Sequence, residues 1–427
     1  MYDVITIGSA TVDVFANTDS QLVKLLTKDG EEDFITYPSG SKILIKELNF
    51  LIGGGGTNTA ASFSRLGLKT GFLGKLGTDQ NGEEVIKVLK EYDVTFLGKK
   101  EGQTGYSIIL DSIEHDRTIL TFKGCNNTLK TKDVNLSFLQ TKWIYSSSMV
   151  EESFNTLKTI FEYAKGQGIK LAFNPSAYQA KLGYNALREV LELLDVLVLN
   201  LEEAQLLLNK KDASAEELAS ALSTHDTDYV VITDGANGST CYHNKIIYHI
   251  SPSSTVKLVE TTGAGDAFAS GFVAGLIQNR CVEESLKLGC VQSESVISKH
   301  GAKNKLLTLK EAEEKMSVFD GKQTKKISEK EIREFTDPEK HLPSFSIAPE
   351  DKGFRLKNGK IIRSIEELAY FLKYAPEDLV LEHIGKDFNH FADWIEHVFG
   401  KESLAKLIRE KEDKKSIVDC LLTSVKN

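Results

Sequence analysis

The chain has 427 residues, of which 41% are apolar and 26% are charged. This composition is that of a globular protein and excludes a disordered chain, and the length allows a large α/β domain with a second domain beside it. The net charge of −9 argues against a nucleic-acid partner, because nucleic-acid-binding surfaces are basic. No apolar run approaches the roughly 20 residues that cross a bilayer, so we expect no membrane partner.

The first residues after Met1 form a strand-like run and lack the basic and apolar segments of a signal peptide. The five cysteines are scattered and contain no C-x-x-C pair, which excludes a disulfide framework or a zinc ribbon. We therefore expect a cytoplasmic protein with reduced thiols.

Short apolar runs alternate with helical patterns along the first three quarters of the chain. Strands are expected at 4–8, 143–147, 170–174, 195–200 and 229–233, and helices at 152–166, 185–194 and 215–223. Runs such as 171–173 and 196–199 are apolar at consecutive positions, as in strands buried on both faces. The alternation predicts an α/β fold, with a doubly wound, mostly parallel sheet covered by helices on both faces.

Two segments interrupt this alternation. Residues 13–50 and 104–122 carry strand patterns without helices between them. We interpret them as a small β-sheet standing off the main domain, as a lid or a dimer surface. The alternative is that they are edge strands of the main sheet.

The character of the sequence changes after Val318. Residues 322–335 are rich in charge, and Pro338, Pro343 and Pro349 follow, which is typical of a linker. Helical patterning then resumes. The predicted domains are therefore 1–318, a linker over 319–353, and a small helical domain of unknown role over 354–427.

The predicted small domain contains three histidines spaced seven residues apart. They are His383, His390 and His397, with Asp387 and Asp393 between them. A metal site is one interpretation. We favour the other, a small aromatic core, because Phe388, Phe391, Trp394 and Phe399 alternate with these residues.

The strongest chemical signal is the segment 261–271, which reads TTGAGDAFASG. Glycine and alanine allow successive backbone N–H groups to converge on one anion, and the apolar run that follows predicts a buried helix pointing its N-terminus there. Asp266 lies in the first turn of that helix. A carboxylate beside a phosphate is useful when it takes a proton from an attacking hydroxyl, although an isolated aspartate at this place could also be a helix cap.

This segment resembles the C-terminal signature of the ribokinase-like (PfkB) carbohydrate kinase family. Four further elements of that family follow the same order: residues 53–60 with 65–67, residues 74–82, the N-x-x-E pattern at 200–203, and the T-x-G-x-x-G pattern at 233–238. The resemblance covers about residues 1–310. It implies a kinase that transfers the γ-phosphoryl group of ATP, with Mg²⁺, to a small sugar or nucleoside.

The resemblance also implies roles for individual residues. Asp266 would be the catalytic base, and Gly263, Ala264 and Gly265 would form the anion hole. The residues expected to bind substrate are Asp13, Gly53, Gly54, Asn58 and Asn174. Those expected to bind the nucleotide are Asn200, Thr233, Gly235 and Gly238, with Glu203 binding Mg²⁺ through water. Turn glycines at 53–56 and a solvated helix start at 200–203 are the structural alternatives.

One position departs from the family pattern. Glu260 stands where potassium-dependent members carry an aspartate that helps to hold a monovalent cation. We therefore expect weak or no activation by K⁺. The sequence contains neither a P-loop nor the G-x-G-x-x-G of a dinucleotide-binding fold, so those nucleotide-binding classes are disfavoured.

The acceptor is less well defined by the sequence. The run 174–177 resembles the pattern of ribokinases and adenosine kinases, which favours a ribose-type substrate. A phosphorylated sugar is the alternative, with Lys42 and Arg117 of the lid as candidate partners for its phosphate. A second class of function is a kinase-derived binding or regulatory protein that works through its C-terminal domain.

Overall fold

The computed structural model describes residues 1–18, 21–27, 30–36, 39–111, 117–223, 227–256, 258–299, 301–321, 325–327, 348, 352–355, 361–374, 383–384, 388–411 and 413–426. The chain divides into two compact units. One takes in residues 1–183 and 187–336, and the other takes in residues 184–186 and 337–427.

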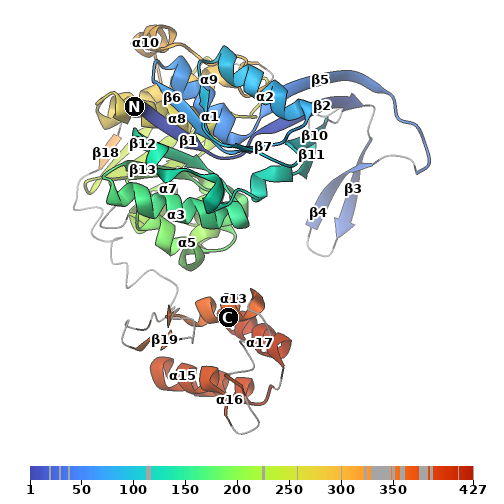
Figure 1. Ribbon diagram of the computed structural model, residues 1–427, viewed down its shortest axis with the longest axis vertical. Coiled ribbons are helices and arrows are strands. Elements are labelled where there is room, and N and C mark those ends of the chain that lie inside the picture. The colour runs from blue at the N-terminus through green and yellow to red at the C-terminus, as the bar shows by residue number, and fades with distance from the viewer. Residues whose placement is uncertain are drawn as a thin grey trace. The chain divides into compact units, whose positions relative to one another are not determined.

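A ten-stranded sheet forms the centre of the first unit (Figure 1), in the order β18-β17-β16-β15-β14-β13-β12-β1-β6-β8. Its strands are β1 (Tyr2–Ile7), β6 (Thr70–Leu73), β8 (Thr95–Phe96), β12 (Thr141–Ser147), β13 (Lys170–Asn174), β14 (Val196–Asn200), β15 (Tyr229–Thr233), β16 (Ser239–His243), β17 (Ile246–Ile250) and β18 (Lys325–Ile327). The run from β8 to β15 is parallel, and the last three strands are antiparallel. The five predicted strands are the central ones, as their unbroken apolar runs indicated.

Helices cover both faces of this sheet (Figure 1). One layer consists of α1 (Gly55–Arg65), α2 (Gln80–Glu91), α8 (Ala264–Ile277), α9 (Val282–Val296) and α10 (Leu309–Ser317). The other contains α3 (Glu152–Gly166), α5 (Tyr184–Leu191) and α7 (Ala215–Leu222). Helix α6 (Leu201–Leu208) contacts α7 and the short helix α4 (Ala177–Ala180). The predicted α/β architecture is confirmed.

Helices α8 and α9 approach each other at the distance of backbone contact. A Cβ placed on Gly271 of α8 would lie 2.8 Å from the Cα of Gly289 in α9. The same helix buries Phe268 and Phe272 against the sheet. Helix α8, which begins at the anion-hole motif, is therefore held on two sides by close packing.

A separate four-stranded sheet, in the order β11-β10-β2-β5, stands beside the main one. Its strands are β2 (Thr11–Thr18), β5 (Ile45–Gly53), β10 (Gly105–Asp111) and β11 (Arg117–Phe122). A two-stranded hairpin, β3 (Gln21–Thr27) and β4 (Gly30–Thr36), lies within the β2–β5 connection. The two segments without helices thus form the predicted standing-off sheet, and they are not edge strands of the main sheet.

Strand β18 lies inside the range 319–353 that we expected to be a linker. It pairs antiparallel with β17 and forms one edge of the main sheet. Its sequence, Lys-Lys-Ile, is too short and too charged to show a strand pattern, and short charged strands are typical of sheet edges. Among the described residues, the first unit therefore extends past Val318.

The second unit is mainly helical. Its elements are β19 (Phe354–Arg355), β20 (Ile361–Ile362), α13 (Ile365–Tyr374), α15 (His390–Phe399), α16 (Glu402–Arg409) and α17 (Lys414–Lys426). The ring of buried His383 lies 5.2 Å from that of Phe354 and 5.3 Å from that of Phe391. These contacts support the aromatic-core interpretation, and the described residues contain no group of three potential metal ligands. Asp387 lies outside the described residues.

No helix in the described part of the chain is both long and apolar enough to cross a membrane.

Candidate active site

The residues predicted to form an anion hole lie at the start of α8. Gly263 has φ +80° and caps the helix, and a Cβ on it would lie 2.4 Å from the Cβ of Ala302. A Cβ on Gly265, in contrast, would meet no atom within 4 Å, so the first turn faces open space there. Because the first N–H groups of a helix have no intrahelical acceptor, this open turn suits an anion. Gly263, Ala264 and Gly265 lie where the motif placed them.

Asp266, in the same turn, is hydrogen-bonded to α1, which begins within the glycine-rich segment 53–56. Asn58 of α1 donates from Nδ2 to Asp266 Oδ2 over 2.8 Å. A Cβ on Gly55 would lie 3.5 Å from Asp266 Oδ1, so the start of α1 runs beside the carboxylate. Burial raises the pKa of Asp266, against the lowering effects of the Asn58 hydrogen bond and the Lys303 charge. The site thus holds a carboxylate with an increased proton affinity.

The predicted sugar-binding residues meet where the small sheet joins α1. Asp13 of β2 accepts a hydrogen bond from Thr11 Oγ1 over 2.8 Å. Its other carboxylate oxygen would lie 1.7 Å from a Cβ on Gly53, so a larger residue there would displace the Asp13 carboxylate. Gly54 adopts φ +94°, and a Cβ on it would lie 2.5 Å from the Ser9 carbonyl oxygen. Gly54 is therefore favoured by its backbone conformation, and Gly53 by the close approach of Asp13.

A cavity of about 240 Å³ connects Asp266 with residues of other strand ends. Its lining includes Asn174 at the end of β13, which the sequence predicted, and Lys123, which it did not. The Lys123 ammonium lies 4.9 Å from the ring centroid of Tyr178, and burial lowers its pKa. Lys123 directly follows lid strand β11, and this position was the only available signal.

Of the two lid cations proposed for a phosphorylated substrate, Lys42 is not among the residues that line this cavity. Lys42 is exposed to solvent. The side chain of Arg117 lies outside the described residues. Among the described residues, Lys123 is the basic side chain that lines this cavity together with Asp266.

The predicted nucleotide residues lie at the ends of adjacent strands. Asn200 at the end of β14 is in register with Thr233 at the end of β15. Gly235 and Gly238 follow at φ +50° and +94°, and a Cβ on Gly238 would lie 2.1 Å from the Ile250 carbonyl oxygen. These are carboxyl ends of parallel strands, where open α/β sheets bind ligands.

Asn200 and Glu203 also form a capping box at the start of α6. Glu203 N donates to Asn200 Oδ1 over 2.7 Å, and Asn200 N donates to Glu203 Oε2 over 3.0 Å. Burial raises the pKa of Glu203 to about 7, and the negative charges of Glu202 and Asp266 act in the same direction. A partly buried carboxylate of this kind fits Mg²⁺, which prefers oxygen ligands and would keep it ionised.

Glu260 is engaged by backbone. Its Oε2 accepts a hydrogen bond from the N–H of Gly301 over 2.9 Å. Glu260, which stands where potassium-dependent members carry an aspartate, therefore stabilises the loop that follows α9 through this hydrogen bond.

Lys303, in that same loop, is a site residue that the motifs did not indicate. Its side chain is only 7% exposed, and its ammonium donates to Asn58 Oδ1. It lies after the last recognised motif and in no periodic pattern, so the sequence offered no sign of its burial.

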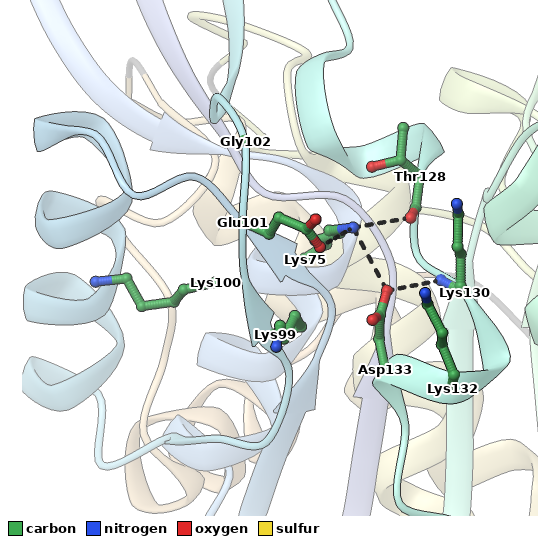
Figure 2. Close-up of a pocket in the computed structure, with 9 residues that line it drawn as sticks. All are labelled: Lys75, Lys99, Lys100, Glu101, Gly102, Thr128, Lys130, Lys132 and Asp133. Carbon is green, nitrogen blue, oxygen red and sulfur yellow. Dashed lines mark hydrogen bonds and ion pairs between the residues drawn. The ribbon is translucent and has the colours of Figure 1, made fainter.

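A second cavity, of about 750 Å³, shares no lining residue with the first. Figure 2 shows Lys75 of β7 (Lys75–Leu76) at its base, with the ammonium directed at Thr128, Glu101 and Asp133. These contacts are 3.0 Å to the Thr128 carbonyl oxygen, 2.9 Å to Glu101 and 3.4 Å to Asp133. The remaining lysines that line it are Lys99, Lys100, Lys130 and Lys132.

The fold and the site together define a ribokinase-like phosphotransferase architecture. A helix start with a carboxylate lies beside the glycine-rich start of α1, and the predicted nucleotide residues Asn200 and Thr233 lie at the carboxyl ends of the parallel strands β14 and β15. Residues 1–309 match the model of the pfkB family of carbohydrate kinases. The chain belongs to this family and is a kinase.

The chain matches most of the length of the curated relatives it resembles. It is 28% identical over 285 residues to a 5-dehydro-2-deoxygluconokinase of Bacillus licheniformis, covering 62% of this chain and 86% of that protein. It is 27% identical to a ribokinase of Staphylococcus aureus, covering 68% of this chain and 97% of that one. An adenosine kinase structure from Sinorhizobium meliloti superimposes with a TM-score of 0.62 at 24% identity, covering 74% of this chain and 99% of that chain.

Proposed function

We propose that this kinase transfers the γ-phosphoryl group of ATP to a hydroxyl group of a small sugar or nucleoside, with Asp266 as the general base. The observation that carries the proposal is the contact between the two glycine-rich segments. Asn58 of the expected acceptor site is hydrogen-bonded to Asp266 at the start of the anion-hole helix. The acceptor hydroxyl and the phosphoryl group would thus meet at one carboxylate.

The chemistry of the step follows from these positions. Asn58 engages Oδ2 of Asp266, so we assign the hydroxyl proton to Oδ1. The acceptor oxygen forms the new bond to the γ-phosphorus as the bond to the β–γ bridging oxygen breaks, and ADP leaves. Backbone N–H groups at Gly263, Ala264 and Gly265 would stabilise the charge on the transferring group, as preorganised donors do in phosphoryl transfer.

The nucleotide would lie over the ends of β14 and β15. Asn200, Thr233, Gly235 and Gly238 border this place, and the first turn of α8 is open at Gly265. Bound Mg²⁺ would offset the negative charge of the triphosphate. Glu203 would hold the ion through water, and its ionised form would be favoured by that charge.

We favour a ribose-type acceptor. Asp13 and Asn58 offer a carboxylate and an amide, which suit hydroxyl groups, and Asn174 lines the cavity at Asp266. Relatives named ribokinase and adenosine kinase support this class.

A second candidate is an acceptor that carries a carboxylate or phosphate. It is favoured by Lys123, whose partly desolvated ammonium lines the same cavity as Asp266. An anionic group placed there would gain a charge-assisted hydrogen bond.

A panel of acceptors separates these candidates. Ribose, fructose, adenosine, cytidine, a sugar acid and a sugar phosphate would each be supplied with ATP and Mg²⁺, and ADP release would be measured against a reaction without acceptor. Selective turnover of ribose or adenosine supports the first candidate. Turnover of the anionic acceptors alone, with a large increase in their KM in Lys123→Met, supports the second. ADP release that no acceptor stimulates would contradict both.

We also propose that the protein forms a homodimer and that it is an active enzyme. The lid sheet exposes apolar side chains, with Phe50 at 61% and Leu120 and Phe122 at 53%. Such a patch supports a homodimer formed through the lid. The intact Asp266, Glu203 and glycine turns speak against the rival reading of a binding or regulatory protein that has lost catalysis.

A further inference from the structure

Lys303 makes a complete set of hydrogen bonds inside the protein. Its ammonium donates to the Ile52 carbonyl oxygen over 2.7 Å, to Thr57 Oγ1 over 3.0 Å and to Asn58 Oδ1. An ammonium has three N–H groups, and each therefore has one acceptor. All three acceptors are uncharged, which is unusual for a lysine that is 7% exposed.

The bond to Asn58 determines which way the Asn58 amide faces. An amide has an acceptor oxygen on one side and a donor NH₂ on the other. With Oδ1 held by Lys303, Nδ2 is turned to Asp266 Oδ2 at 2.8 Å. In the reversed orientation two oxygens would face each other, and Asp266 would lose its donor.

The charges around Lys303 come from several elements. Asp13 on β2 and Asp266 on α8 act on it by Coulombic attraction, and Tyr92, after α2, donates from its hydroxyl to the Lys303 carbonyl oxygen. Glu84 and Glu91 of α2 line the cavity of about 570 Å³ that Lys303 also borders. Burial lowers the pKa of Lys303 to about 7, against the attraction of the two aspartates.

We propose that Lys303 is a positioning residue for phosphoryl transfer, which orients the Asn58 amide so that Asn58 holds the Asp266 carboxylate ready to accept the hydroxyl proton. The proposal rests on the proposed role of Asp266 as the base. Lys303 acts through Asn58, and its charge also lowers the proton affinity of Asp266. Positioning groups of this kind act on the reaction through geometry, where a displacement of about 1 Å can cost about 100-fold in rate.

The test compares Lys303→Met, Asn58→Ala, the double variant and Asp266→Asn, with Lys75→Met as the matched buried-lysine control. We expect kcat to fall about 10- to 100-fold in Lys303→Met while the KM for ATP stays within about twofold. The acidic limb of the kcat–pH profile should move to higher pH, because Asp266 loses both a donor and a nearby positive charge. In the double variant kcat should fall no further than in Asn58→Ala alone, since both substitutions break the same chain of hydrogen bonds from Lys303 through Asn58 to Asp266.

Lys75→Met controls for the general effect of removing a buried ammonium, and its pH profile should match that of the wild type. Thermal unfolding shows which variants are folded. If Lys303→Met does not fold, Lys303→Gln replaces it, because the amide removes the charge but keeps polar contacts.

Two outcomes overturn the proposal in distinguishable ways. If Asp266→Asn retains turnover, the base assignment fails and the positioning role fails with it. If Asp266→Asn is inactive but Lys303→Met keeps the wild-type kcat and pH profile, or the double variant shows additive losses, only the positioning role is wrong.

Discussion

The first unit contains two buried lysines whose pKa values move in opposite directions. Lys75 is 4% exposed and Lys303 is 7% exposed. Lys75 contacts Glu101 and Asp133, and these acidic partners raise its pKa even though burial acts the other way. Lys303 contacts only neutral acceptors, and burial lowers its pKa to about 7.

The difference shows that burial alone does not fix the charge of a lysine. Direct contact with carboxylates holds Lys75 as a cation and makes it part of the scaffold. At Lys303 the carboxylates are near but out of contact, which leaves both the lysine and Asp266 with shifted proton affinities. Such shifts are typical of functional sites.

The largest expected effect on activity comes from replacing the carboxylate of Asp266. We expect Asp266→Asn to lower kcat by roughly 10²–10⁴, because the amide keeps the shape but cannot accept the proton. Nucleotide affinity should change little. Asp133→Asn, at the other lysine, is the matched control and should retain its kcat. Steady-state kinetics of both variants decide the matter, and near-normal turnover of Asp266→Asn would refute the assignment of the base.

The scaffold lysine can be tested through stability. Lys75→Met should lower the free energy of unfolding by about 2–4 kcal/mol, because Asp133 is left buried without its cation. Its kcat should stay at the wild-type value. Urea unfolding monitored by circular dichroism, together with kinetics at a temperature where the variant is folded, provides the measurement. A stable variant with impaired catalysis would reverse the roles assigned to the two lysines.

The two lysines should also give different pH dependences of stability between pH 7 and 9. The folded-state pKa of Lys303, about 7, lies below the unfolded value of roughly 10.4. Between these values the unfolded chain binds the additional proton, so the contribution of Lys303 to stability rises with pH, by about 2 kcal/mol from pH 7 to 9.

The raised pKa of Lys75 has the other sign. Its contribution is fully present below the unfolded pKa and is lost only as the pH rises through the higher folded value. The free energies of unfolding of the wild type, Lys303→Met and Lys75→Met would be measured at pH 7, 8 and 9. The value for the wild type minus that for Lys303→Met should rise with pH. The value for the wild type minus that for Lys75→Met should stay constant. A flat difference at Lys303 would show that its pKa is not depressed.

Removing the second unit should leave both lysine environments intact. All residues assigned to the site lie in the first unit. A chain ending at residue 336 keeps β18 and should retain kcat within about twofold. One ending at Val318 lacks that edge strand, and we expect it to be somewhat less stable but active. A folded but inactive protein after truncation at 336 would show that the second unit helps to build the site.

Potassium should have the smallest effect. Glu260 accepts a hydrogen bond from Gly301, in the loop that carries Lys303, and its side chain is longer than that of the family's aspartate. Rates in KCl, NaCl and tetramethylammonium chloride at equal ionic strength should agree within about twofold. A strong potassium-specific activation would mean that Glu260 completes a cation site.

The sequence predicted those parts of the molecule that carry a local pattern. Central strands such as β14 are continuous apolar runs, and the segment 261–271 combines glycines, an aspartate and a buried helix within a few residues. The family resemblance rests on the same segments. These signals located the sheet and the lid, and they predict a site around Asp266.

What was missed depends on contacts between distant segments. Lys303 looks like a surface residue until folding places it beside Asn58, 245 positions earlier in the chain. Lys123 becomes part of the cavity only because β11 ends next to Tyr178. Strand β18 forms because β17 offers a free edge, and nothing in Lys-Lys-Ile indicates that pairing.

The backbone contact between α8 and α9 links two glycines outside the site to the position of the proposed base. Gly271 and Gly289 touch neither Asp266 nor the cavity, yet a methyl group on Gly271 would have to displace α9 or α8. Because Asp266 is carried at the start of α8, any sliding of that helix is transmitted to the carboxylate. Substitution at these two positions is therefore limited by the tolerance of the reaction to misplacement of its base.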